Sequence, residues 1–277
     1  MDKIISIEKL QRYALDIRKD VIRSLAEAGS GHLGGSLGLA DVFTALYFNI
    51  MNHRPEDPEW EYRDRLILSI GHVAPVLYAT LANCGYFSKS ELITLRQLGS
   101  RLQGHPSRDF KLPGIEISSG SLGQGLSVAT GIALAARYDR KNIFVYSIHG
   151  DGELQEGNIW EAAMSAAFYK LDNLVAIVDR NYKQIDGHTE NVMALEPLKD
   201  KWEAFSWDCY KCNGNNIKEL IDTLSKLKSK KGKPKVIIAE TLMGKGVKSI
   251  EDNHLWHGKA PSKKQAKQFI NELEKNY

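Results

Sequence analysis

Residues 142–181 constrain the fold more than any other part of the sequence. Residues 142–149 form a β-branched and aromatic run that predicts a buried strand. Residues 158–171 place apolar side chains at helical spacing, and residues 173–178 form a second apolar run. This order predicts a βαβ unit in which a right-handed crossover lays the two strands parallel. The sequence therefore indicates an α/β fold.

Polar residues follow the ends of both predicted strands. Gly150-Asp151-Gly152 comes after the first strand, and Asp179-Arg180-Asn181 after the second. Ligands of parallel α/β sheets bind at the carboxyl edge, so we expect Asp151 and Asn181 to lie there together. Their oxygens suit Mg²⁺ or Ca²⁺, and Gly152 lets a diphosphate approach the backbone closely. The pattern predicts a metal and diphosphate site, although Gly-Asp-Gly by itself is also typical of a helix-capping turn.

The same two tripeptides resemble the thiamine diphosphate motif, which runs from Gly-Asp-Gly to Asn over about thirty residues with a βαβ unit between. Residues 150–157, Gly-Asp-Gly-Glu-Leu-Gln-Glu-Gly, resemble transketolase rather than a decarboxylase or a 2-oxo acid dehydrogenase. Further segments similar to transketolase follow in the family's order: 31–38, 69–72, 104–106, 120–125 and 257–261. The resemblance implies a parallel sheet flanked by helices on both faces, the diphosphate-binding module, as a single domain over residues 1–277.

The resemblance also implies roles for individual residues. It places Mg²⁺ or Ca²⁺ on Asp151, Asn181 and the backbone carbonyl of Lys183. Residues expected to bind thiamine diphosphate are His72, Gly120, Ser121, Leu122, Gly152, Glu156, Asn181 and His257. Those expected to take part in catalysis are His32, His105 and His257, with His32 and His105 facing the sugar. Glu156 is also expected at a subunit contact.

The histidines indicate a polar pocket without reference to a family. Six of the eight adjoin a glycine: His32, His72, His105, His149, His188 and His257. At a glycine content of about 7%, only one or so is expected, so these imidazoles are predicted on turns. Converging donors suit a diphosphate and a polyhydroxylated sugar. A zinc site is the competing interpretation, but Cys209 and Cys212 have no second ligand pair.

Composition agrees with a cytoplasmic enzyme subunit. The chain has 37 basic and 34 acidic residues and a net charge of +3. This near balance does not indicate a nucleic-acid-binding protein. We expect neither a signal peptide nor a membrane span, because no apolar run approaches about eighteen residues. The three cysteines are consistent with a reducing cytoplasm.

Full-length transketolases add a pyrimidine-binding domain with a catalytic glutamate and then a C-terminal domain. The resemblance therefore implies a separate C-terminal subunit that carries these parts, in an α2β2 heterotetramer. Leu33 and Ser36 stand where the long enzymes usually have prolines, which also resembles the two-chain transketolases. The implied reaction transfers a two-carbon ketol unit between sugar phosphates, as in the pentose phosphate pathway. The sequence does not name the sugar pair.

Three other interpretations stay open at this stage. Gly244-Lys245-Gly246 is shared with deoxyxylulose phosphate synthase, another thiamine diphosphate enzyme. A non-catalytic, cofactor-binding regulatory partner would keep the metal ligands but tolerate loss of His32 and His105, which are both present. A nucleotide-binding α/β protein would need a Walker or Gly-x-Gly-x-x-Gly loop between the first strand and the helix that follows it. The sequence has no such loop in that position.

The remaining patterns predict further elements. Helices are expected at Ile7–Ala28, Leu39–Asn49, Leu122–Arg137, Ile217–Leu227 and Ser262–Tyr277, strands at Arg65–Ile70 and Val236–Glu240, and an irregular loop at Gln184–Pro197.

Overall fold

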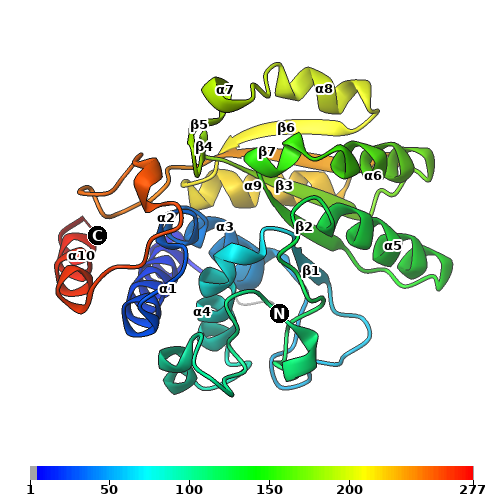
Figure 1. The fold of residues 1–277 in the computed structure, drawn as a ribbon. Helices are drawn as coiled ribbons and strands as arrows, with labels where there is room; N and C mark the ends of the chain where they lie inside the picture. Colours follow the sequence, from blue (N-terminus) through cyan, green and yellow to red (C-terminus); the bar gives the residue numbers. More distant parts are fainter. Residues whose placement is uncertain (1–4, 277) are drawn as a thin grey trace.

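The computed structural model of the protein describes residues 5–276 and contains a parallel sheet of five strands (Figure 1). All neighbouring pairs in this sheet are parallel. Their order across the sheet is β1 (Arg65–Leu68), β2 (Val145–Gly150), β3 (Leu174–Arg180), β7 (Lys235–Glu240) and β6 (Asp208–Asn213). The predicted α/β class with a parallel sheet is confirmed.

Helices cover both faces of the sheet, as predicted (Figure 1). One face is covered by α1 (Ile7–Ala28), α2 (Leu33–Gly38), α3 (Ala40–Ala45), α4 (Ala74–Cys84) and α9 (Ile217–Lys228), and α10 (Lys263–Asn276) packs against α1. The other packs against α5 (Gly125–Tyr138), α6 (Gly157–Phe168) and α8 (Leu198–Ala204). None of the helices within residues 5–276 is both long and apolar enough to cross a membrane.

Strand β3 shows why the central strands read as continuous apolar runs. Val175 and Ile177 join the core on one face, whereas Leu174, Ala176 and Val178 join the core on the other. Successive side chains of a strand point to opposite faces, so a strand covered on both sides must be apolar at every position. This burial on both faces places β2 and β3 at the centre of the molecule.

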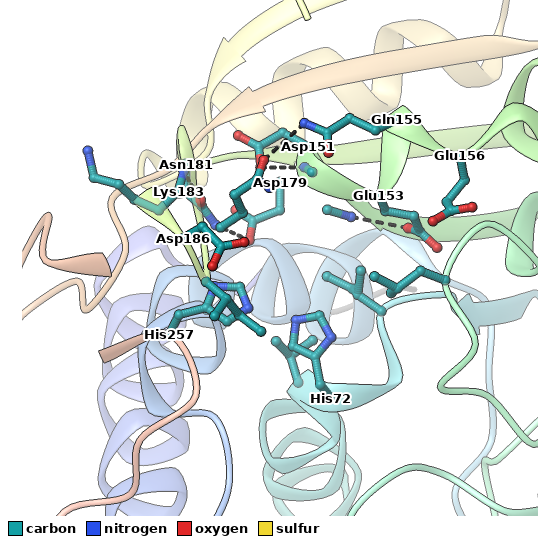
Figure 2. Close-up of a pocket in the computed structure, with 18 residues that line it drawn as sticks. His72, Asp151, Glu153, Gln155, Glu156, Asp179, Asn181, Lys183, Asp186 and His257 are labelled. Atoms are coloured by element: carbon teal, nitrogen blue, oxygen red, sulfur yellow. Dashed lines mark hydrogen bonds between the residues drawn. The ribbon is translucent and has the colours of Figure 1, made fainter. Parts of the chain in front are cut away.

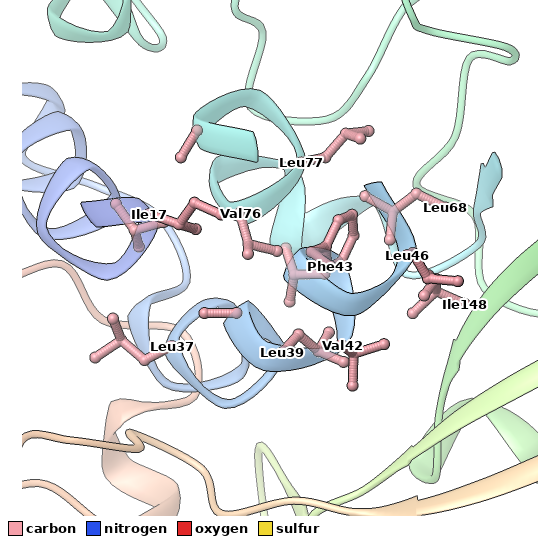
Figure 3. Close-up of a cluster of buried hydrophobic side chains, with 14 of the residues drawn as sticks. Ile17, Leu37, Leu39, Val42, Phe43, Leu46, Leu68, Val76, Leu77 and Ile148 are labelled. Atoms are coloured by element: carbon pink, nitrogen blue, oxygen red, sulfur yellow. The ribbon is translucent and has the colours of Figure 1, made fainter. Parts of the chain in front are cut away.

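The larger core fills the space between the sheet and the α1, α3 and α4 layer (Figure 3). Phe43 of α3 is fully buried among Ile17 of α1 and Val76 of α4, and Leu68 and Ile148 extend from the sheet toward them (Figure 3). Full burial of side chains of this size contributes roughly 1.5–3 kcal/mol each. The core holds the strand ends, and therefore the site built on them, in a rigid frame.

The predicted βαβ unit is present as β2, α6 and β3. Its strands pair in parallel with Gly150 opposite Asp179, and the amide of Asp151 donates to the carbonyl of Asp179 at 3.2 Å. Asp151 and Asn181 therefore leave the sheet at the same carboxyl edge, as expected from the handedness of the crossover.

Two predicted segments differ from the structure. Residues 184–197 are not an irregular loop, because they contribute to the antiparallel hairpin of β4 (Lys183–Gln184) and β5 (Gly187–His188) and then to α7 (Thr189–Val192). The predicted helix Leu39–Asn49 is α-helical to Ala45 and continues as a π-helical turn, Leu46–Ile50. Short hairpins and wide helical turns depend on tertiary contacts and leave no periodic signal.

Candidate functional site

A cavity of about 250 Å³ opens at the carboxyl ends of β2 and β3 (Figure 2). Its polar lining comes from segments far apart in the sequence: His72, Asp151, Glu153, Gln155, Glu156, Asp179, Asn181, Lys183, Gln184, Asp186 and His257. Figure 2 shows His72 and His257 on one side, with Asp151 and Asn181 across from them. The cavity has imidazoles on one wall and oxygen ligands on the other.

Asp151 is a buried carboxylate at the head of this cavity, with 2% of its surface exposed. Its Oδ1 accepts from the Gly152 amide at 2.8 Å, and its Oδ2 accepts from the Tyr182 amide at 2.7 Å and Arg180 Nη1 at 3.1 Å. Burial raises the pKa of Asp151 to about 6, although Arg180 and the two amides act in the opposite direction. A bound cation would stabilise the ionised carboxylate further.

Asn181 is held in one orientation by its neighbour. Its Nδ2 donates to Asp179 Oδ2 at 2.9 Å, and its Oδ1 accepts from the Lys183 amide at 2.9 Å, which leaves a second lone pair of Oδ1 for a cation. Asp179 also accepts from the hydroxyl of Thr241. An acidic side chain that fixes a metal-ligating amide in this way is a typical supporting contact at a metal site.

Asp151, Asn181 and Lys183 therefore meet at one cavity, and a carboxylate and amide set of this kind fits a hard cation such as Mg²⁺ or Ca²⁺. No cluster of three His, Cys, Asp or Glu side chains suited to a metal occurs among residues 5–276, so this part of the chain has no zinc-type ligand set.

Three of the predicted histidines form a group beside the cavity. The ring centroids of His32 and His72 are 4.9 Å apart, those of His72 and His257 are 5.3 Å apart, and those of His32 and His257 are 5.8 Å apart. Burial lowers the pKa of His72 to about 3 and that of His32 to about 4, and it also lowers the pKa of His257. All three are therefore neutral at pH 7.

Two nitrogens of this group are buried without a hydrogen-bond partner among the described residues: Nδ1 of His32 and Nδ1 of His257. Unsatisfied buried polar atoms are uncommon and costly in a folded protein. Their presence next to a polar cavity fits a ligand rich in oxygen atoms.

His105 stands apart from this group, over the segment Ser119–Gly125. A Cβ added at Gly120, whose φ is +145°, would lie 2.9 Å from His105 Cδ2, so only glycine allows the two to pack. Leu122 of the same segment lines the cavity, whereas Gly120, Ser121, His32 and His105 are not among its lining residues. Within this segment, Leu122 is the residue that reaches the cavity wall.

The remaining glycine-flanked histidines do not reach the cavity. His149 is fully buried, with its ring hydrogen-bonded to Ser147 and Glu153 at 2.8 and 3.1 Å. His188 caps α7 by accepting from the Glu190 amide at 3.3 Å. The adjacency to glycine predicted turns, which is wrong for His149 in β2 and His188 in β5, and it did not distinguish ligand-facing imidazoles from structural ones.

Sequence reasoning missed Glu153, Asp179 and Arg180 as parts of the site. Glu153 is buried to 2% exposure and connects Ser69, Gly123 and His149. All three lie inside the two motifs that predicted the site. Each is a charged residue within two positions of a predicted metal ligand, and this proximity could have identified them as supporting residues.

Comparisons with known proteins agree with this geometry. The family described as transketolase, thiamine diphosphate binding domain, matches residues 10–276. A relative from Phocaeicola vulgatus, named as one subunit of an apulose-4-phosphate transketolase, is 42% identical over 97% of this chain and 95% of its own length. A 6-deoxy-6-sulfo-D-fructose transketolase subunit from a Clostridium species is 43% identical over 96% of each chain.

The crystal structure of transketolase from Campylobacter jejuni superposes with a TM-score of 0.90 at 35% identity, over 96% of this chain and 43% of that one. The chain thus matches the subunit-type relatives over nearly their whole length and the longer enzyme over less than half. The protein belongs to the transketolase family and represents its thiamine diphosphate binding domain.

Proposed function

We propose that this chain is the N-terminal subunit of a two-chain transketolase that moves a two-carbon ketol unit from a ketose phosphate to an aldose phosphate. The observation that carries the proposal is the cavity at the carboxyl ends of β2 and β3. There Asp151 and Asn181 face the neutral imidazoles of His72 and His257. Oxygen ligands for a cation and uncharged donors for a diphosphate are what such a cofactor needs.

We propose that particular residues bind each part of the cofactor. Asp151, Asn181 and the carbonyl of Lys183 would hold Mg²⁺ or Ca²⁺. The backbone of Gly152 and of Gly120–Leu122, together with His72 and His257, would bind the diphosphate. Bound thiamine diphosphate supplies the nucleophilic carbon that the protein's own side chains lack. The chain contributes binding, orientation and proton transfer, and we assign these roles to one domain over residues 1–277.

His32, His105 and His257 suit proton transfer at the sugar. An imidazole that is neutral at pH 7 can accept a proton from a hydroxyl or donate its N–H to an oxygen. Burial lowers the pKa of all three, so they begin the reaction uncharged. We expect His32 and His105 to contact sugar hydroxyls and to stabilise the developing negative charge on oxygen.

A partner subunit is part of the proposal. This chain aligns with 95% and 96% of the length of the two subunit-type relatives, but with only 43% of the Campylobacter enzyme. Helices α5 and α6 also present large apolar side chains to solvent: Val128 is 37% exposed, Met164 55% and Phe168 78%. Glu156 is exposed at the start of α6, where it also lines the cavity. We propose that a C-terminal subunit with a pyrimidine-binding domain and a catalytic glutamate covers this face, in an α2β2 heterotetramer.

We place the assembled enzyme in the cytoplasm, since all three cysteines, Cys84, Cys209 and Cys212, are free thiols.

Reconstitution tests the function. The purified chain, a candidate C-terminal subunit and their mixture are each assayed for ketol transfer with thiamine diphosphate and Mg²⁺. Activity is expected only in the mixture, with co-elution of both chains in size-exclusion chromatography. Phe168→Asp should prevent co-elution, whereas Ile93→Asp, at an exposed position of the 3-10 helix Lys89–Thr94 on the opposite face of the sheet, serves as the control. Full turnover by the isolated chain would refute the two-subunit proposal.

A further inference from the structure

A single buried guanidinium connects the cavity to the segment that forms one of its walls. The side chain of Arg180, at the end of β3, is 0% exposed. Its Nη1 donates to Asp151 Oδ2 at 3.1 Å and to Thr189 Oγ1 at 2.9 Å. Its Nη2 donates to Glu190 Oε1 at 2.6 Å and to Glu196 Oε1 at 3.0 Å. One cation thus binds three carboxylates, Asp151 from the end of β2 and Glu190 and Glu196 from the segment after β3.

The segment that Arg180 binds begins and ends on the same network. Tyr182 donates its amide to Asp151 Oδ2 at 2.7 Å, and its ring lies 3.9 Å from the guanidinium of Arg180. Further along, the Glu190 carboxylate accepts the amides of Leu195 at 3.2 Å and Glu196 at 3.3 Å. Residues 182–196 are therefore closed into one unit around the guanidinium, and we call this unit the wall segment.

Part of the wall segment borders the cavity and part does not. Lys183, Gln184, Ile185 and Asp186 line the cavity, whereas Arg180 itself and residues 189–196 are not among its lining residues. Arg180 therefore has no direct access to a ligand in the cavity. Any influence of Arg180 on binding passes through Asp151 or through the wall segment.

The chemistry of arginine explains why this position needs a guanidinium. The planar group offers several N–H donors in fixed directions, so it can bind Asp151 on one side and Glu190 and Glu196 on the other. A lysine ammonium keeps the charge but is a compact point donor on a flexible stem. Without the guanidinium, the negative charges of the three carboxylates would lie close together and would be less well neutralised.

We propose that Arg180 is a positioning residue that couples cation and diphosphate binding at Asp151 to the order of the wall segment. This inference rests on the proposed function, because it takes the ligand to be thiamine diphosphate with Mg²⁺. Coupling is reciprocal, so ligand binding orders residues 189–196, and loosening those residues weakens ligand binding.

Three variants test the proposal in the assembled enzyme. Arg180→Lys keeps the charge and removes the bridge. Glu190→Gln loosens the wall segment without touching Asp151. Arg63→Lys is the matched control, because Arg63 also pairs with a carboxylate, Glu116, and lies outside the cavity lining. Circular dichroism establishes that each variant is folded.

Two measurements follow, calorimetric titration with thiamine diphosphate at saturating Mg²⁺ and amide hydrogen exchange of residues 182–196 with and without both ligands. Arg180→Lys is expected to raise Kd by about 10 to 100-fold, the usual cost of losing a supporting contact at a metal site. Glu190→Gln should raise Kd by a smaller factor, and Arg63→Lys should leave it unchanged. Ligands should slow exchange at residues 189–196 in the wild type and in Arg63→Lys but not in Arg180→Lys.

An unchanged Kd in Arg180→Lys would overturn the proposal, and so would ligand-dependent protection of residues 189–196 that persists in that variant. An effect of Arg180→Lys with none of Glu190→Gln would also overturn it, because Arg180 would then act on Asp151 alone. Wild-type enzyme that binds no thiamine diphosphate would instead contradict the proposed function.

Discussion

The backbone amide of Gly123 donates a 2.8 Å hydrogen bond to Oε1 of Glu153, 30 residues further along the chain. The same oxygen accepts from the hydroxyl of Ser69, which in turn accepts from the Gly125 amide at 3.0 Å. A Cβ at Gly125 would lie 2.4 Å from the Ser69 side chain, so the contact requires glycine. One buried carboxylate therefore holds the Ser119–Gly125 segment, with its cavity residue Leu122, against the ends of β1 and β2.

Removing that carboxylate should destabilise the fold. Glu153→Ala leaves His149 and the Gly123 amide without their acceptor, and we expect the free energy of unfolding to fall by about 3–5 kcal/mol. Urea denaturation of wild type and variant measures the change. Glu203→Ala is the control, since its ion pair with Lys199 is about half exposed and is worth less than about 1 kcal/mol. Equal losses in the two variants would show that the Glu153 network is not stabilising.

The buried histidines predict loss of stability in acid. The unfolded chain protonates His32 and His72 near the ordinary pKa of 6.5, whereas burial holds their folded pKa values at about 4 and about 3. Between pH 6.5 and about 4 the unfolded state therefore binds more protons, and the free energy of unfolding falls as the pH drops. The double variant His32→Asn and His72→Asn should show a shallower fall in urea denaturation across that window. An identical pH dependence would contradict neutral, buried imidazoles.

Asp151 provides a test of the cation site. Asp151→Ala removes the charged ligand, so thiamine diphosphate should bind more weakly by more than the roughly 10 to 100-fold that loss of a supporting contact costs. Folding should be affected less than binding. Titration calorimetry of cofactor at several Mg²⁺ concentrations, on the assembled variant, measures the effect. Unchanged affinity with an unchanged Mg²⁺ requirement would remove Asp151 from the metal site.

His105 and His72 should respond differently to substitution. His105 lies outside the cavity lining and His72 lies within it. His105→Ala is expected to lower kcat/KM by about 10² to 10⁴-fold with little change in cofactor affinity, as for loss of a positioned acid or base. His72→Ala should weaken cofactor binding, and saturating thiamine diphosphate should restore much of its rate. Rescue of His105→Ala by cofactor, with none of His72→Ala, would mean that the two roles are reversed.

Much of the fold could be predicted from local patterns. The α1 helix, Ile7–Ala28, has its predicted bounds, and β2, α6 and β3 form the predicted βαβ unit, because apolar periodicity reports directly which face of an element is buried. The handedness of the crossover then brought Asp151 and Asn181 to one edge. Helix α4 was not predicted, since it is buried along most of its length and so lacks an amphipathic period.

The sequence by itself determined the fold class, the strand ends that carry the polar residues, and the family resemblance of its motifs. Only the tertiary structure decided which of the glycine-flanked histidines meet. His32, His72 and His257 come together from three distant segments, while His149 pairs with Glu153 inside the fold. The network of Arg180 likewise depends on how residues 182–196 fold back over β3. A local pattern reports burial and turns, but the partner of a buried polar group is set by long-range packing.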